Sequence, residues 1–165
     1  MSPSFDQYDI DYLEIRNVAF EWAHSYDTKD WERLRKCLAP STRLDFRSLQ
    51  GELHEGLSPD AYAEILSSPP YLGNKLLKTQ HLLGISKWEL LDDGSVKVAH
   101  QIRVAHQRYV DDTFSTVANK GHAHGVTTHW FRKTDGHWKL EGVAPKLEFF
   151  EYDLFGTLSP EKEGQ

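Results

Sequence analysis

Apolar side chains in the first part of the chain recur every three or four residues, which is the spacing of an amphipathic helix. This pattern predicts one long helix over residues 12–26. A second, shorter helix is predicted over residues 31–38, and Pro40 ends it because proline lacks the amide hydrogen of a helix interior. A third helix is predicted over residues 58–66, where a serine cap is followed by proline at the first helical position.

Most of the remaining chain alternates apolar and polar residues, which is the pattern of half-buried β-strands. The predicted strands cover residues 42–49, 76–91, 95–109, 120–133 and 138–143. Asp-Gly pairs, typical of tight hairpin turns, follow two of them. Helices followed by long antiparallel strands predict an α+β fold in which the helices cover one face of a curved sheet. Such a sheet forms a cone with a central pocket suited to a small apolar ligand.

The length and composition fit one domain. The chain has 165 residues, of which 12% are aromatic, and such rings bury enough area for one core despite a mean hydropathy of −0.60. We expect a single domain over residues 1–165, with an ordered core at residues 10–158 and loose ends at residues 1–9 and 159–165.

Charge and cysteine content disfavour several kinds of partner. The net charge of −6 and the isoelectric point near 5.8 argue against nucleic acid and against an anionic membrane surface. The single cysteine, Cys37, excludes an internal disulfide and a multi-cysteine metal cluster. We expect neither a signal peptide nor a membrane span, and therefore a location in the cytoplasm or another intracellular compartment.

Two histidines stand where a strand face should be apolar. His106 shares the alternation of Val98 and Val104, so we expect it to point inward, and His81 lies inside the preceding predicted strand. Either one alone is more readily interpreted as a core histidine with its hydrogen bonds satisfied. Two inward histidines on neighbouring strands favour acid–base chemistry, because imidazole titrates near neutrality.

Tyr26 and Asp27 end the first predicted helix and have two interpretations each. On the sequence alone, the favoured role of Asp27 is to cap the next helix. The functional alternative is a carboxylate that fixes the tautomer of a histidine and makes it a stronger base. Tyr26 is either a core aromatic residue or a hydroxyl donor that polarises a carbonyl in the pocket.

A metal site is the less favoured interpretation of three further histidines. His122 and His124 would share a strand face, and His129 extends the pattern to H-x-H-x4-H. The cupin-type pattern, however, expects a carboxylate shortly after the first two histidines, and none follows here. The chain also contains no glycine-rich nucleotide-binding motif and no nucleophile elbow.

Several segments, at matching spacing over about residues 20–153, resemble fungal scytalone dehydratases. The clearest are Glu21-Trp22-Ala23, Ser25-Tyr26-Asp27, Lys29-Asp30-Trp31, Thr79-Gln80-His81, His106-Gln107-Arg108-Tyr109 and Gly121-His122-Ala123-His124. The resemblance implies a cone-shaped α+β barrel of the nuclear-transport-factor-2-like type, a homotrimer, and no metal or other cofactor. It also implies dehydration of scytalone or vermelone in melanin biosynthesis, a branch of fungal secondary metabolism.

The resemblance assigns catalytic roles to four residues. Tyr26 would donate to the ketone of the substrate, and His81 would take the α proton and return it to the departing hydroxyl. His106 would be its partner, and Asp27 would orient the histidine pair.

The residues expected to bind the substrate are Phe46, Leu49, Tyr71, Gly125, Thr127 and Pro145. All of them except Pro145 differ from the family pattern. Phe46 stands in place of a second tyrosine, Gly125 in place of a serine and Thr127 in place of an asparagine. Leucines, including Leu154 and Leu158, replace phenylalanines. These changes suggest a polyketide bulkier than a bicyclic ketone, with Tyr71 as a candidate for the hydroxyl that Phe46 lacks.

The sequence thus predicts a cofactor-free carbon–oxygen lyase that removes water from a β-hydroxy ketone of an aromatic polyketide, scytalone-like or bulkier. Two alternatives stay open: a polyketide cyclase or isomerase that uses the same pocket, and a non-catalytic ligand-binding module of the same fold. A metal-dependent enzyme ranks last. The apolar C-terminal segment, residues 148–158, is a candidate lid.

Overall fold

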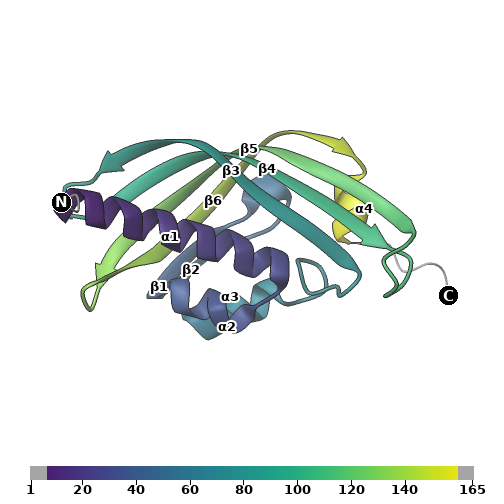
Figure 1. Cartoon of the computed structure of the whole chain (residues 1–165), viewed down its shortest axis with the longest axis horizontal. Coiled ribbons are helices and arrows are strands. Elements are labelled where there is room, and N and C mark those ends of the chain that lie inside the picture. Colours follow the sequence, from purple (N-terminus) through teal and green to yellow (C-terminus); the bar gives the residue numbers. More distant parts are fainter. Residues whose placement is uncertain (1–6, 160–165) are drawn as a thin grey trace, which may run out of the picture.

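The computed structural model describes residues 7–159 as an α+β fold (Figure 1). The helices are α1 (Gln7–Thr28), α2 (Trp31–Cys37), α3 (Pro59–Leu66) and α4 (Leu154–Leu158), with a 3-10 turn, η1, at Arg47–Leu49. The strands are β1 (Leu38–Asp45), β2 (Leu53–Leu57), β3 (Leu77–Leu90), β4 (Val96–Tyr109), β5 (Val117–Thr134) and β6 (His137–Tyr152).

The strands form one curved sheet in the order β2-β1-β6-β5-β4-β3. The pairing of β1 with β6 is parallel, and the other pairings are antiparallel. α1 runs across one face of this sheet, while α2 and α3 lie near β1 and β2 (Figure 1). The predicted fold class is therefore confirmed, and the helices close the concave face of the sheet.

The core lies between α1 and the concave face. Ile15, Ala19, Trp22 and Tyr26 are buried at helical spacing on α1, which explains why the sequence periodicity found this helix. Opposite them, the alternating residues of β4 that were expected to share an inward face are buried or half-buried (Val96, Val98, His100, Ile102, Val104 and His106). The prediction of which β4 side chains point inward is confirmed.

Several element boundaries differ from the sequence prediction. α2 ends at Cys37, and Pro40 lies in a strand rather than at a helix end, because proline also disfavours helical backbone at the residue before it. The strand predicted at residues 42–49 ends at Asp45, where the chain turns into η1. β6 continues nine residues past its predicted end at Val143, to Tyr152, and β2 and α4 had no periodic signal to predict them.

The expected loose ends fall mostly outside the described residues, except that residues 7–9 belong to α1. Within residues 7–159, no helix is long and apolar enough to cross a membrane.

Candidate active site

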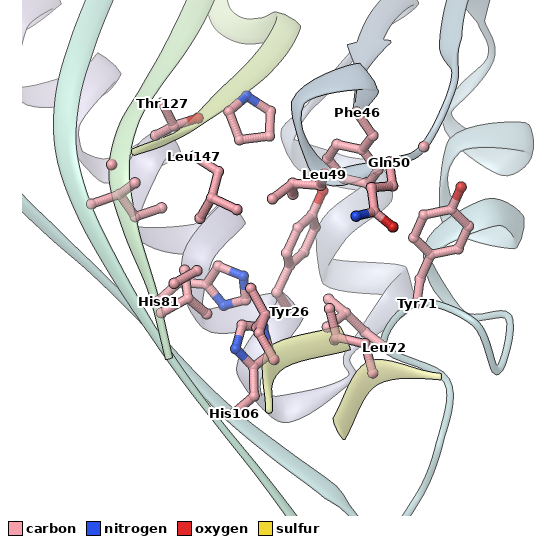
Figure 2. Close-up of a pocket in the computed structure, with 18 of the residues that line it drawn as sticks. Tyr26, Phe46, Leu49, Gln50, Tyr71, Leu72, His81, His106, Thr127 and Leu147 are labelled. Atoms are coloured by element: carbon pink, nitrogen blue, oxygen red, sulfur yellow. The ribbon is translucent and has the colours of Figure 1, made fainter. Parts of the chain in front are cut away.

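A cavity of about 340 Å³ opens between the concave face of the sheet, α1 and the segments that follow β1 and α3. Every predicted site residue except Asp27 lines it: Tyr26, Phe46, Leu49, Tyr71, His81, His106, Gly125, Thr127 and Pro145. Figure 2 shows Tyr26, His81 and His106 next to one another, with Tyr71 across the cavity from the histidines. The walls between them are mainly aliphatic and aromatic, as suits an apolar ligand.

Asp27 acts on His81 from behind the cavity. Its Oδ1 lies 2.6 Å from His81 Nδ1, and its two carboxylate oxygens accept the His81 backbone N–H at 3.1 and 3.0 Å. The Thr79 hydroxyl donates to the same carboxylate at 2.9 Å. A carboxylate only accepts hydrogen bonds, so His81 Nδ1 carries a proton and Nε2 is left for the cavity.

The prediction that Asp27 caps the second helix is wrong. α1 continues to Thr28, the backbone then takes a left-handed conformation at Lys29 (φ 57°), and Asp30 caps α2 by accepting from the Arg33 N–H at 3.0 Å. Asp27 is thereby left in the last turn of α1, where its side chain reaches β3. The functional interpretation of Asp27 gains its geometry from these two additional helical residues.

Tyr26 is held by a second tyrosine. Its hydroxyl oxygen lies 2.6 Å from that of Tyr62, which α3 places behind the cavity wall. Burial, reinforced by Tyr62, raises the pKa of Tyr26 well above its ordinary value. The Trp22 ring packs on Tyr26 with ring centres 4.7 Å apart. Tyr26 is therefore a fixed, protonated hydroxyl at the cavity surface.

His106 faces His81 across the cavity floor, with ring centres 6.3 Å apart. Its Nδ1 lies 3.3 Å from the carbonyl oxygen of Gly121, so this nitrogen donates to the backbone and Nε2 can accept. Burial, and next the neighbouring His81, lower the pKa of His106 to about 3. His106 is thus a neutral imidazole beside His81.

Thr127 adds an unsatisfied hydroxyl. Its side chain lines the cavity, is 1% exposed, and its Oγ1 has no hydrogen-bond partner among the residues that the structure describes. A buried hydroxyl without a partner is costly, and because Oγ1 itself is shielded from the cavity, Thr127 presents other atoms to a ligand.

The backbone around Gly125 explains why a glycine stands there, which the sequence alone did not reveal. A Cβ there would lie 2.0 Å from the Lys146 carbonyl oxygen on β6, at a point where the pairing of β5 with β6 shifts register. The glycine is required by this close approach of two strands. The close contact between the strands therefore explains Gly125 better than the expected enlargement of the pocket does.

The three histidines of the H-x-H-x4-H pattern do not converge. His124 Nε2 lies 2.8 Å from Glu151, and His122 Nδ1 lies 3.0 Å from an Arg103 nitrogen. His129 instead is fully buried in the core, packed at 4.5 Å against the Trp22 ring. No group of three or more metal-ligating side chains comes together within residues 7–159.

Sequence reasoning missed two residues that complete the site. Tyr62 falls at a buried helical position of α3 and resembles an ordinary core aromatic, so no pattern singled it out. Thr79 lies in one of the segments that resemble the family, but its hydrogen bond to Asp27 was not predicted.

The fold and the site define a class: an α+β cone of the NTF2-like type whose pocket is lined by a tyrosine and two histidines, one of them paired with a carboxylate. Among solved structures, the protein Kfla4162 from Kribbella flavida superposes with a TM-score of 0.74 at 16% identity, covering 88% of this chain and 95% of that one. A hexachlorocyclohexane dehydrochlorinase, LinA type 2, superposes with a TM-score of 0.66 at 15% identity, covering 88% and 93%. Both likenesses concern the fold.

The family model of scytalone dehydratase matches residues 7–164. Scytalone dehydratase PfmaJ from Pestalotiopsis fici is 46% identical over 164 residues, which cover 93% of this chain and 86% of that protein. Dehydratase AgnL8 from Paecilomyces divaricatus is 48% identical over 138 residues, covering 84% and 79%. The chain belongs to the scytalone dehydratase family, and the prediction of a hydro-lyase is confirmed.

Proposed function

We propose that the protein dehydrates a β-hydroxy ketone of an aromatic polyketide by enolisation within this cavity. The observation that carries the proposal is the Asp27–His81 pair, 2.6 Å apart, beside Tyr26, whose ring centre lies 5.3 Å from that of His81 in the same cavity. A general base, an oriented carboxylate and a carbonyl donor in one apolar cavity are the groups that this reaction needs.

The reaction begins with the ketone oxygen accepting a hydrogen bond from Tyr26. His81 Nε2 then takes the proton from the α carbon, and the negative charge that moves to the ketone oxygen is stabilised by Tyr26. Asp27 stabilises the imidazolium that forms. The enolate expels the β-hydroxyl, which takes the proton from His81 and leaves as water, so that the base is regenerated.

The cavity favours a compact fused-ring substrate over the bulkier polyketide that the substitutions at the expected binding residues suggested. Its volume of about 340 Å³ lies near the lower end of the range, roughly 300–1,000 Å³, that is usual for small-molecule sites. Scytalone is the first substrate to test, because two of the relatives that this chain matches are named scytalone dehydratases of Colletotrichum orbiculare and Pyricularia oryzae. A melanin pathway is the corresponding setting.

We also propose that the chain forms a homotrimer. The support is a set of exposed apolar side chains on β3 and β6, which a second copy of the chain would cover (Leu82, Ile85, Phe149, Phe150 and Tyr152). Light scattering coupled to size exclusion should give three times the monomer mass; a monomer mass at micromolar concentration would refute this arrangement.

The function is tested by steady-state turnover of scytalone, followed by absorbance. We expect turnover by the unsubstituted protein, its loss in His81→Ala, and its retention in His137→Ala, a control histidine whose side chain is 75% exposed. Phe46→Tyr tests whether the absent hydroxyl limits the rate with this substrate. A protein that enolises ketones but eliminates no water from any β-hydroxy ketone would instead be a cyclase or isomerase.

A further inference from the structure

Tyr62 has an unusual position for a core tyrosine. Its side chain is fully buried, it does not line the cavity, and its hydroxyl oxygen is 2.6 Å from the hydroxyl oxygen of Tyr26, which does. Figure 2 shows the Tyr26 side chain reaching toward Phe46 and Leu49. Phe46 offers no hydroxyl on that side, and Tyr71 packs on Phe46 with ring centres 5.6 Å apart. The hydroxyl that contacts Tyr26 therefore comes from α3.

The direction of this hydrogen bond follows from what surrounds each phenol. Among the described residues, Tyr26 is the one hydrogen-bond acceptor of the Tyr62 hydroxyl, since the neighbouring Trp22 side chain offers only an N–H donor. If Tyr26 donated to Tyr62, the Tyr62 proton would be buried without an acceptor, which costs roughly 1–3 kcal/mol. Tyr62 consequently donates, and the Tyr26 proton is left to point into the cavity.

We infer that Tyr62 is a positioning residue for catalysis: it donates to Tyr26, aims the Tyr26 proton at the substrate carbonyl, and strengthens that donation as the enolate forms. The inference rests on the proposed function and deepens it. Hydrogen bonds in a chain polarise one another, and the effect is greatest where water is excluded. As charge develops on the ketone oxygen, part of it reaches the Tyr26 oxygen, where the Tyr62 proton lies.

Both phenols act by donation rather than by ionisation. Burial raises the pKa of Tyr62 to about 12, and it raises that of Tyr26 well above its ordinary value. No proton leaves either residue during the reaction; the only proton that moves goes from the α carbon to His81 and then to the leaving hydroxyl. Tyr62 therefore needs no contact with solvent, in agreement with its burial.

The test compares Tyr62→Phe, which removes one oxygen and keeps the ring, with Tyr12→Phe, a control on an exposed face of α1. For Tyr62→Phe we expect kcat for scytalone to fall about tenfold with KM within about twofold, the loss of one hydrogen bond in the transition state. Tyr12→Phe should match the unsubstituted protein. In the Tyr62→Phe background, Phe46→Tyr should restore part of kcat, since it returns a hydroxyl to the neighbourhood of Tyr26. Equal kcat in Tyr62→Phe and the unsubstituted protein would overturn the inference.

A second readout does not depend on turnover. A bicyclic aromatic ketone without a β-hydroxyl should bind, and its carbonyl stretching band in the infrared should shift to lower frequency. In Tyr62→Phe, part of that shift should be lost; an identical band in both proteins would overturn the role of Tyr62. If Tyr62→Phe does not fold, proton NMR of the unsubstituted protein decides: the Tyr62 hydroxyl signal must persist, and the Tyr26 signal must move downfield, when the ketone binds.

The failure of this inference and that of the proposed function look different. If the unsubstituted protein is active and Tyr62→Phe has the same kcat and the same carbonyl band, only the role of Tyr62 is refuted. Protein that neither turns over a β-hydroxy ketone nor shifts the carbonyl band of the bound ketone removes the proposed function, and with it the assignment of Tyr62.

Discussion

Replacing Asp27 by asparagine isolates the contribution of charge behind His81, the histidine that we propose transfers the proton. The asparagine side chain would keep an oxygen near His81 Nδ1 but would lack the negative charge that lies 2.6 Å from that nitrogen in the native protein. The pair is largely shielded from solvent, since the side chains of His81 and Asp27 are 9% and 15% exposed. The imidazolium formed during catalysis is therefore stabilised by the carboxylate more than it would be at the surface.

The magnitude follows from the value of a hydrogen bond to a charged group. Such a bond contributes roughly 1.5–3 kcal/mol, which corresponds to about a 10- to 150-fold decrease in kcat. KM should change much less, because Asp27 does not line the cavity. The assay is steady-state turnover of scytalone, and Asp112→Asn, an exposed carboxylate in the β4–β5 connection, is the matched control.

Asp27 also accepts from Thr79 and from the His81 backbone, so the melting temperature of the Asp27→Asn variant must be measured beside its rate. A variant that is folded at the assay temperature and retains kcat within about threefold of the native value would refute the role of Asp27, since the weakest such bond already predicts about tenfold. A loss of kcat shared by Asp112→Asn would show that the assay reports overall charge instead.

Three further predictions concern stability and binding. Burial lowers the pKa of His106 to about 3 and that of His100 to about 4. Each histidine is therefore neutral in the folded protein, and at a pH below its ordinary pKa of 6.5 it binds a proton when the protein unfolds. Their contribution is complete above about pH 6.5 and is lost as the pH falls toward about 4 for His100 and about 3 for His106, by about 1.4 kcal/mol per histidine per pH unit. A melting temperature that is constant from pH 7 to 5 would contradict this. Gly125→Ala should lower the free energy of unfolding, measured by urea titration, by about 1–3 kcal/mol, because the added Cβ meets the Lys146 carbonyl oxygen. An unchanged urea midpoint would mean that the two strands move apart freely. Thr127→Val should leave stability at or above native and binding of a hydroxylated ketone unchanged in calorimetry, because Oγ1 is shielded from the cavity and unpaired; weaker binding would show that Oγ1 reaches the ligand.

The sequence predicted those parts of the fold that repeat. α1 and β4 each present a regular apolar face to one core, so helical and alternating spacing located them and oriented His106 correctly. The second half of β6 has no such face, because most of the β6 residues beyond Lys146 are exposed. The structure of β6 there depends on pairing with β5, which a local pattern does not record. The helix α4 buries Leu154 and Thr157, but its five residues are too few for a period to be recognised.

The site was predicted to a similar extent and for similar reasons. The family resemblance located the residues that meet in the cavity, since their spacing is retained. The capping role assigned to Asp27 was wrong because helix ends depend on one or two residues, here Lys29 and Asp30. Tyr62 was missed because its position in the pattern is that of any buried aromatic residue. Only the partner of its hydroxyl distinguishes it, and that partner, Tyr26, lies 36 residues away in the sequence.

The central claim is that His81 removes the α proton of a ketone held by Tyr26. The most direct measurement is NMR-detected exchange of that proton for deuterium, using a bicyclic aromatic ketone with no β-hydroxyl to eliminate. The unsubstituted protein and His137→Ala should catalyse exchange at the α carbon, and His81→Ala should not. Exchange at the native rate in folded His81→Ala would contradict the account.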